Sequence, residues 1–406
     1  MNRFMIIGGM ACFWLFSPEA LTLIGVSAGR GGYPAVSALL GWALIIAVCL
    51  SIMIVSSRLT AAGGEDSARF GGDEPLLLRV LLFAGIYGVA ILASTGMLVT
   101  AGFAFNEIFF YRFPNFGFAA LLLAGVVVLQ QAPERVQYTI QYGATLTCAV
   151  GLLVLIVAGL MGERPVVESL QSPSGHGVLP YVTLVVVFLG FDQIALQADE
   201  GDGWPLLPVV FVGSSMVLAI WLLLSIQYVN GDRLADTSIP YLIAAREILG
   251  QAGRSIMGLI VIAGAFAASH GLFILARIYL TARYPSARTP VVRRGLPLIM
   301  GLVIGLLMVM GLAGSANLET YIRGTVLIWL SGAALAVLRG VRFLNQGNSV
   351  ISVAGYVGGA LMLVSVFFMA SHASQPYLMG YYMGVIFVIS AFCITLLEVM
   401  RKKSAS

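Results

Sequence analysis

The sequence predicts an all-α integral membrane protein. Of its 406 residues, 59% are hydrophobic and only 10% are charged, whereas a soluble domain normally carries about 25% charged residues. The 22 basic and 18 acidic side chains are too few to cover a globule of this length. Long apolar runs recur along the chain, so the bilayer is expected to be its main solvent. These observations exclude a cytosolic enzyme, a secreted disulfide scaffold and a disordered chain.

About twelve stretches are long and apolar enough to cross a bilayer as helices. Each needs roughly 20 mostly apolar residues, and a transmembrane barrel would instead show alternating apolar and polar residues. The first stretch contains Glu19 and is followed by no A-x-A cleavage site, so we expect a retained helix and not a signal peptide. The predicted spans lie near 4–28, 36–57, 79–105, 115–131, 138–161, 180–199, 206–229, 256–280, 295–314, 319–339, 350–371 and 377–400.

The basic residues are distributed unevenly between the two sides of this predicted topology. With the N-terminus in the cytoplasm, about 15 of the 22 Lys and Arg residues fall on the inner side and about seven on the outer side. Short loops rich in Lys and Arg stay in the cytoplasm. The sequence therefore predicts a multi-pass protein of the cell (inner) membrane with both termini cytoplasmic.

One connection and two glycine pairs carry local signals. Ile239–Leu249 is an amphipathic stretch introduced by Ser238 and Pro240, and proline at the first helical position is typical of a helix start. We expect a loop helix there, lying across the outer mouth of the protein. Small residues four apart allow transmembrane helices to pack closely. Such pairs are Gly301 with Gly305 and Gly355 with Gly359.

Thiols and imidazoles give no sign of a metal or cofactor site. The cysteines all lie in apolar stretches without CxxC spacing, and the three histidines are scattered. No nucleophile–base pair or phosphate loop is present either. We therefore expect no metal, no cofactor and no enzymatic activity. The cysteines are Cys12, Cys49, Cys148 and Cys393.

Two carboxylates inside apolar spans are the main chemical signal. Ionisable residues in a bilayer are costly and usually face a cavity or a partner. Glu19 in span 1 follows Pro18, and Asp192 in span 6 follows Gly190. Transporters often build a midplane site from broken helices at equivalent positions of two repeats. We predict that both spans are interrupted and that both carboxylates serve binding or coupling. The alternative is a structural carboxylate hydrogen-bonded to a neighbouring helix.

Four further residues are weaker candidates for the same site. Trp14 and Phe191 lie beside the two carboxylates and are candidate walls of a substrate pocket, although aromatic residues in spans often serve packing alone. His270 lies within span 8 and is a coupling candidate, with a neutral packed histidine as the alternative. Ser269 beside it is a candidate sodium ligand near the break in span 1. Phe13 completes the predicted substrate-binding set.

At these residues the chain resembles the amino acid–polyamine–organocation superfamily. Phe188–Glu200 resembles its sixth helix, and the cationic amino acid transporter branch often shows a GFD and an acidic pair there. Leu59–Gly64 resembles the stretch that ends in Gly-Gly after the second helix. Leu275–Pro290 is similar to the exit of the eighth helix, and Glu134–Val136 resembles the connection before the fifth. The resemblance covers most of residues 5–345.

This resemblance implies the LeuT fold, a 5+5 inverted repeat followed by two additional helices. The first repeat would comprise residues 1–161, the second 162–345, and the additional helices and a short tail 346–406. It also implies a secondary transporter that moves an amino acid or related organic amine by alternating access. Protons are one candidate coupling ion, because burial disfavours the charged form of a carboxylate, and sodium is another. The alternative function is a non-transporting membrane subunit that anchors or assists a partner.

The sequence departs from the family's pattern in span 1. The family's first helix is normally unwound at a Gly-(Ser/Thr)-Gly motif whose amides bind the substrate carboxylate. Alignment on Ser17 and Pro18 places Ala11, Cys12 and Phe13 at those positions. A phenylalanine there removes the close backbone approach that glycine permits, which favours a cationic amine, a substrate oriented differently, or the non-transporting alternative. Span 5 also lacks the lysine of some proton-coupled members.

The predicted topology is testable by labelling. In a cysteine-free background, Asn2→Cys and Ser404→Cys are expected to resist an impermeant maleimide added outside intact cells, because both termini are predicted to be cytoplasmic. Asp236→Cys, in a predicted outer loop, is the positive control. Labelling of residue 2 or 404 from outside would contradict the topology.

Overall fold

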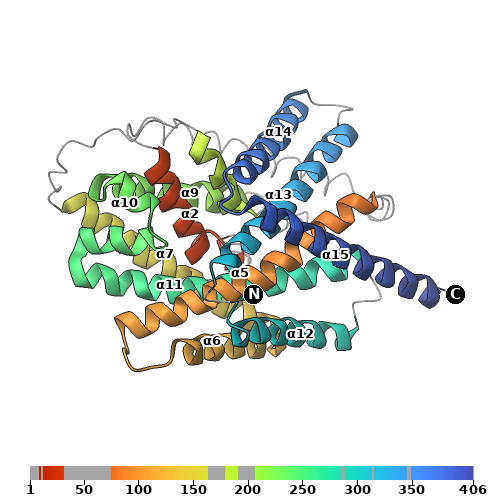
Figure 1. Cartoon of the computed structure of the whole chain (residues 1–406), viewed down its shortest axis with the longest axis horizontal. Helices are drawn as coiled ribbons and strands as arrows, with labels where there is room; N and C mark the ends of the chain where they lie inside the picture. Colours follow the sequence, from red (N-terminus) through yellow and green to blue (C-terminus); the bar gives the residue numbers. More distant parts are fainter. Residues whose placement is uncertain are drawn as a thin grey trace. The chain divides into compact units, whose positions relative to one another are not determined.

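The computed structural model folds into helices joined by turns, and the part it describes contains no strand (Figure 1). The described residues are 9–10, 12–31, 75–162, 179–190, 206–284, 289–312, 315–344 and 349–405.

Among these residues, eight helices are long and apolar enough to cross a membrane, and α6 (Asn115–Gln131) is a shorter apolar helix. All nine coincide with predicted spans, whereas predicted span 2 lies outside the described residues. The multi-pass, all-helical prediction is confirmed over this part of the chain. The eight helices are α5 (Leu76–Ile108), α7 (Glu134–Met161), α9 (Leu206–Tyr228), α11 (Pro240–Arg283), α12 (Pro290–Val309), α13 (Ala316–Leu344), α14 (Ser349–Ser371) and α15 (Pro376–Ala405).

The chain divides into two compact units. The first comprises 1–50, 97–119 and 134–268, and the second comprises 51–96, 120–133 and 269–406. The first unit also holds three shorter elements. These are α2 (Pro18–Gly31), the 3₁₀-helix η1 (Leu179–Phe188) and α10 (Gly231–Ala235).

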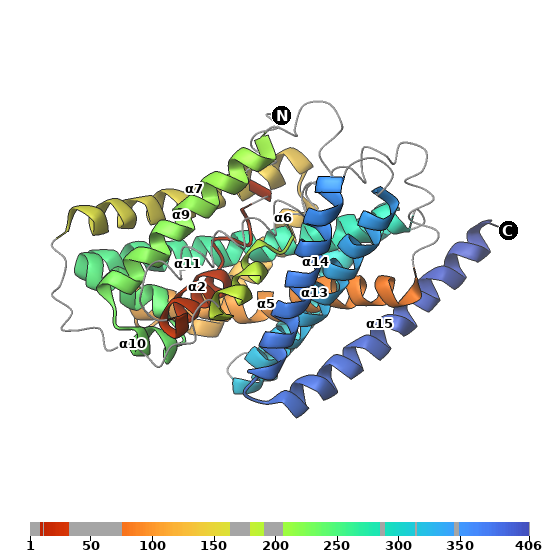
Figure 2. The ribbon, with the colours of Figure 1, turned by 90° about the horizontal axis from the view of Figure 1, so that it is seen from above.

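In the first unit, α2 packs against η1, α10 and α9 (Figure 2). Two glycines of α2 allow the close approach. A Cβ at Gly25 would lie 2.5 Å from the side chain of Pro240, and a Cβ at Gly29 would lie 2.5 Å from the backbone of α10. Atoms this close cannot coexist, so side chains at these positions would force the helices apart. Glycine therefore sets how closely α2 is held.

Helices α7 and α11 run antiparallel within the first unit. The Cys148 thiol contacts the carbonyl of Ile260 at 3.5 Å, and the Gln141 amide donates to the carbonyl of Ala267 at 3.1 Å. The contacts thus advance by seven residues, or two helical turns, in opposite directions. A Cβ at Gly151 would lie 2.8 Å from the Ile260 side chain. The first unit therefore contains a closely packed pair of helices, α7 and α11.

A helix is present where the sequence predicts the loop helix Ile239–Leu249. Helix α11 begins at Pro240, but its backbone departs from helical geometry at Leu249 (φ −134°) and Gly250 (φ 60°). A positive φ is accessible to glycine without strain. The first ten residues of α11 are therefore a separate helical piece with the bounds that the sequence indicates.

In the second unit, α13 lies along α14 and contacts α15 (Figures 1 and 2). The rings of Tyr321 and Tyr382 stack with centroids 4.4 Å apart, and Arg79 of α5 forms an ion pair with Glu398 of α15. The predicted close packing at Gly301 is confirmed, since a Cβ there would lie 2.5 Å from the side chain of Val127. Glycine contacts and polar pairs hold this unit together, as expected where lipid supplies little drive for helix association.

A glycine substitution in the second unit tests this packing. A Cβ at Gly85 of α5 would lie 2.4 Å from the Cα of Trp329 in α13. Gly85→Ala is expected to lower the free energy of unfolding by about 1–3 kcal/mol through overpacking. The control is Gly213→Ala, where nothing lies within 4 Å of the added Cβ. Thermal unfolding of the purified protein measures both, and equal stability of the two variants would contradict the packing described.

Candidate functional site

The chain of span 1 is interrupted immediately before Pro18. Residues 12–17 form turns, and α2 begins at Pro18. The Ser17 amide donates to the Trp14 carbonyl at 3.0 Å, and the Ser17 hydroxyl accepts from the Ala20 amide at 3.1 Å. Serine is a preferred N-cap, and proline has no N–H to satisfy at the first helical position. The local sequence therefore starts a new helix in the middle of an apolar span.

Span 6 is also irregular. Its described part is the 3₁₀-helix η1, which ends in a turn at Gly190 with φ 95°. Only glycine adopts this dihedral readily, so Gly190 ends the helical run. The predicted interruptions are thus present in span 1 and at the described end of span 6. The predicted site residues Phe191 and Asp192 lie outside the described residues.

Trp14 connects the two irregular stretches. Its indole Nε1 donates to the Val186 carbonyl of η1 at 3.0 Å in a buried position. Farther along, the hydroxyl oxygens of Ser27 and Thr183 lie 3.1 Å apart. Phe13 and Trp14 are only 1% and 2% exposed. The sequence predicted Trp14 as a pocket wall and Phe13 as a substrate-binding residue, and the structure places both in the interrupted stretch itself.

Helices α11 and α7 support the same stretch from its other sides. A Cβ at Gly264 of α11 would lie 2.3 Å from the carbonyl oxygen of Phe16, so only glycine allows this approach. The Gln141 amide donates to the carbonyls of Gly9 at 3.3 Å and Ala267 at 3.1 Å. Side-chain donors and close glycine contacts thus accommodate backbone that is no longer helical.

Sequence reasoning missed this role of α7, although a signal was present. Gln137, Gln141 and Thr145 recur every four residues in an apolar helix, and all three are buried. Residues four apart lie on one helix face. A row of amides and hydroxyls on the buried face of a predicted span indicates backbone acceptors opposite it. These donors are neutral, so the pattern of charged residues in the sequence does not reveal them.

Glu19 lies in the first turn of α2 and is partly buried. Its carboxylate interacts electrostatically with Tyr241 of α11, and the nearby Thr22 hydroxyl donates to the Pro18 carbonyl at 2.8 Å. A carboxylate in the first turn also interacts favourably with the helix dipole. Glu19 therefore occupies a polar position beside the interruption, where both a structural and a binding role are chemically supported.

Ser269 and His270 are fully buried on α11 and belong to the second unit. The Gln130 amide donates to the backbone carbonyl of His270 at 3.1 Å. The structure therefore gathers Phe13, Trp14 and Glu19 in the first unit and assigns the two coupling candidates of span 8 to the other.

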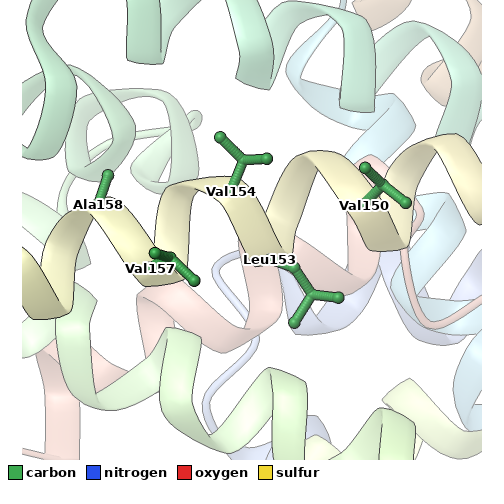
Figure 3. Close-up of a pocket in the computed structure, with 5 residues that line it drawn as sticks. All are labelled: Val150, Leu153, Val154, Val157 and Ala158. Atoms are coloured by element: carbon green, nitrogen blue, oxygen red, sulfur yellow. The ribbon is translucent and has the colours of Figure 1, made fainter.

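A metal centre or a surface pocket within the described ranges would be an alternative site to the interruption of span 1. No group of three His, Cys, Asp or Glu side chains lies together there. The pocket in Figure 3 is formed by one face of α7 and is lined by aliphatic residues alone. Its exposed apolar lining is typical of a lipid-facing groove. The lining residues are Val150, Leu153, Val154, Val157 and Ala158.

Comparison with known proteins links this architecture to transporters. No family model matches the chain. The chain is 28% identical over 283 residues to a protein described as the branched-chain amino acid permease BrnQ of Corynebacterium glutamicum. The match covers 66% of this chain and 64% of the permease, so the chain spans less than two thirds of that protein's length.

The fold has counterparts among solved structures. The crystal structure of the Eremococcus coleocola manganese transporter, in complex with an aromatic bis-isothiourea substituted compound, superposes with a TM-score of 0.65 at 11% identity. The superposition covers 99% of this chain and 95% of that one. A mutant of the same transporter gives a TM-score of 0.62 at 12% identity. The chain is thus a multi-pass, helical membrane protein with the fold of a solved transporter.

The bond between Trp14 and η1 can be tested with a matched pair of substitutions. Trp14→Phe removes an indole N–H that donates to Val186, whereas Trp329→Phe removes a buried indole N–H with no partner among the described residues. Trp14→Phe is expected to lower the free energy of unfolding by about 1 kcal/mol more than Trp329→Phe does, because a hydrogen bond contributes about that net amount. Thermal unfolding measures the difference, and equal losses would mean that the bond does not hold the stretch.

Proposed function

We propose that the protein is a secondary transporter that moves an amino acid or related organic amine by alternating access. The observation that carries this proposal is the interrupted span 1 bound through Trp14 to η1, which ends at Phe188 before a turn at Gly190. Inside a membrane, irregular backbone is tolerated only where protein or a cavity surrounds it. Broken helices offer N–H groups to a carboxylate and C=O groups to an ammonium, which are the two ends of an amino acid. Similarity to a permease and to a transporter fold supports the same conclusion.

The side chains around the interruption favour an apolar amino acid. Phe13 and Trp14 are buried there, and in the same unit the ring centroids of Phe188 of η1 and Phe211 of α9 lie 5.0 Å apart. Pockets for apolar ligands are lined mainly by such aromatic side chains, with a few polar groups that fix orientation. The permease relative is named for branched-chain amino acids. Leucine, isoleucine and valine are therefore the first substrates to test, and lysine tests the cationic-branch resemblance.

Coupling is assigned to the carboxylates of the two interrupted spans. Glu19 and Asp192 are the proposed proton- or cation-binding groups, with Ser269 and His270 as further coupling candidates. A carboxylate held in a bilayer must be protonated, hydrated or paired. Taking up and releasing a proton with the substrate would couple transport to the pH gradient. The 5+5 inverted repeat, with two additional helices after it, is the frame in which we propose that these residues act.

Uptake into proteoliposomes tests the function directly. The full chain is expected to accumulate at least one radiolabelled branched-chain amino acid above empty liposomes when a pH or sodium gradient is imposed. Lysine, putrescine and Mn²⁺ are assayed in parallel. Uptake of Mn²⁺ alone would overturn the proposal in favour of metal transport. Absence of uptake and of exchange for every solute would favour the non-transporting subunit.

The carboxylates are tested separately. Asp192→Asn and Glu19→Gln remove an ionisable group at nearly constant shape, so gradient-driven uptake is expected to fall at least about ten-fold while solute exchange persists. The control is Glu107→Gln, which removes a carboxylate that pairs with Arg254 at 3.4 Å in an exposed position. Wild-type rates and pH dependence in a Glu19→Gln, Asp192→Asn double variant would show that both acids are structural.

A further inference from the structure

We propose that Gln141 is a neutral latch of the transport cycle, which holds the stretch before the interruption of span 1 against α7 and α11 and releases it as the site opens. The side-chain amide of Gln141 donates to the Gly9 carbonyl at 3.3 Å and to the Ala267 carbonyl at 3.1 Å. The inference that release belongs to a transport cycle rests on the proposed function. The latch itself rests on the contacts described below.

The side-chain amide nitrogen of Gln141 donates to acceptors in two different elements. An amide nitrogen carries two hydrogens, and here each acceptor belongs to a different element, the start of span 1 and α11. Gln141 is completely buried. Removing its donors would leave carbonyl groups in an apolar interior with fewer partners. One uncharged side chain thus joins three segments of the first unit.

The surroundings of Gly9 show that the chain is seated on α7. A Cβ at Gly9 would lie 3.1 Å from the backbone nitrogen and Cα of Tyr142. The Thr145 hydroxyl, one turn beyond Gln141, lies 3.4 Å from the same Gly9 carbonyl and 3.0 Å from the Gln141 carbonyl. Two polar side chains therefore converge on the one Gly9 carbonyl, which marks it as the point of attachment.

The position of this attachment next to a break is what makes it a latch. Residues 12–17 form turns, so Gly9 is not connected to α2 by continuous helix. A segment joined through turns moves relative to α2 more readily than one joined through a helix, because turn residues absorb changes in φ and ψ. Hydrogen bonds between neutral groups are individually weak enough to break and re-form. Charged groups would bind the same carbonyls more strongly and resist release.

Cys12 is a built-in reporter of the latch, because it lies three residues after Gly9 and is 7% exposed. Cys148 lies on α7 and is completely buried, so it reports general loosening of the unit. Two full-length proteins, each with only one of these cysteines, provide the two probes. Because both thiols are buried in the structure, both are expected to react slowly with a water-soluble maleimide.

Gln141→Met keeps the length of the side chain and removes both donors. It is expected to raise the rate of Cys12 alkylation about ten-fold, the effect of losing one or two net hydrogen bonds, and to leave Cys148 alkylation unchanged. The control is Gln131→Met, because Gln131 donates to the Arg294 carbonyl at 3.1 Å in an exposed position. An unchanged Cys12 rate in folded Gln141→Met protein would overturn the latch, and so would a parallel rise at both cysteines.

A second variant keeps the test decisive if Gln141→Met does not fold. Gln141→Glu carries one O–H donor only when protonated. Burial raises the pKa of a carboxyl group above its usual range, so the Cys12 alkylation of this variant, relative to wild type, is expected to fall as the pH is lowered from about 9 to about 5, and a pH-independent ratio across that range would contradict the latch. Alkylation of Cys12 needs no transported solute, so it tests the latch independently of transport. If Gln141 controls Cys12 alkylation but the wild type takes up no solute, the proposed function is refuted and the contact made by Gln141 is not.

Discussion

A polypeptide in a bilayer must supply hydrogen-bond partners for its own backbone N–H and C=O groups, and that constraint shapes the first unit. A continuous helix would meet it without help, but span 1 stops before Pro18 and restarts. Each backbone group exposed by the stop needs a partner from another segment. Ser17 caps the new helix from within, and Gln141 accounts for the carbonyl of Gly9 from α7. The packing of the neighbouring helices follows from the need to reach these groups.

Close backbone contact is the second means by which the unit accommodates the interruption. At Gly264 the neighbouring helix comes against the Phe16 carbonyl, and at Gly25 the new helix comes against Pro240. Such contacts give dispersion energy without relying on water to drive helices together. Trp14 adds one directional bond to this packing. The interruption is therefore enclosed by protein, as irregular backbone within a membrane requires.

Much of the fold was predictable because hydrophobic length is a strong signal. Eight of the nine described apolar helices begin and end within about five residues of the predicted spans. Helix α11 begins about 16 residues before its predicted span, because it includes the helix starting at Pro240, which was predicted separately from its local sequence. The interruption at Pro18 was also predictable, because proline lacks a backbone donor. The hydrogen-bond partners of the backbone groups at the interruption were not predictable, because pairing between elements depends on how the helices pack in three dimensions. Gln141 illustrates the limit, because its sequence shows a buried polar residue but not the two carbonyls that it binds.

The candidate carboxylates show a different limit. Composition identifies Glu19 as costly in an apolar span, yet the structure places it in the first turn of α2, where the helix dipole favours a carboxylate, and near Tyr241. A sequence pattern cannot separate these surroundings from an open cavity, because both require the same residue type.

The glycine contacts have a further consequence for the recognition of related proteins. At Gly264 an added Cβ would overlap a neighbouring backbone, so substitution by any other residue is sterically disfavoured. Exposed apolar positions such as Val388 and Phe392 accept many apolar residues. Distant relatives of this chain should therefore be recognised by the spacing of their obligatory glycines more readily than by overall identity.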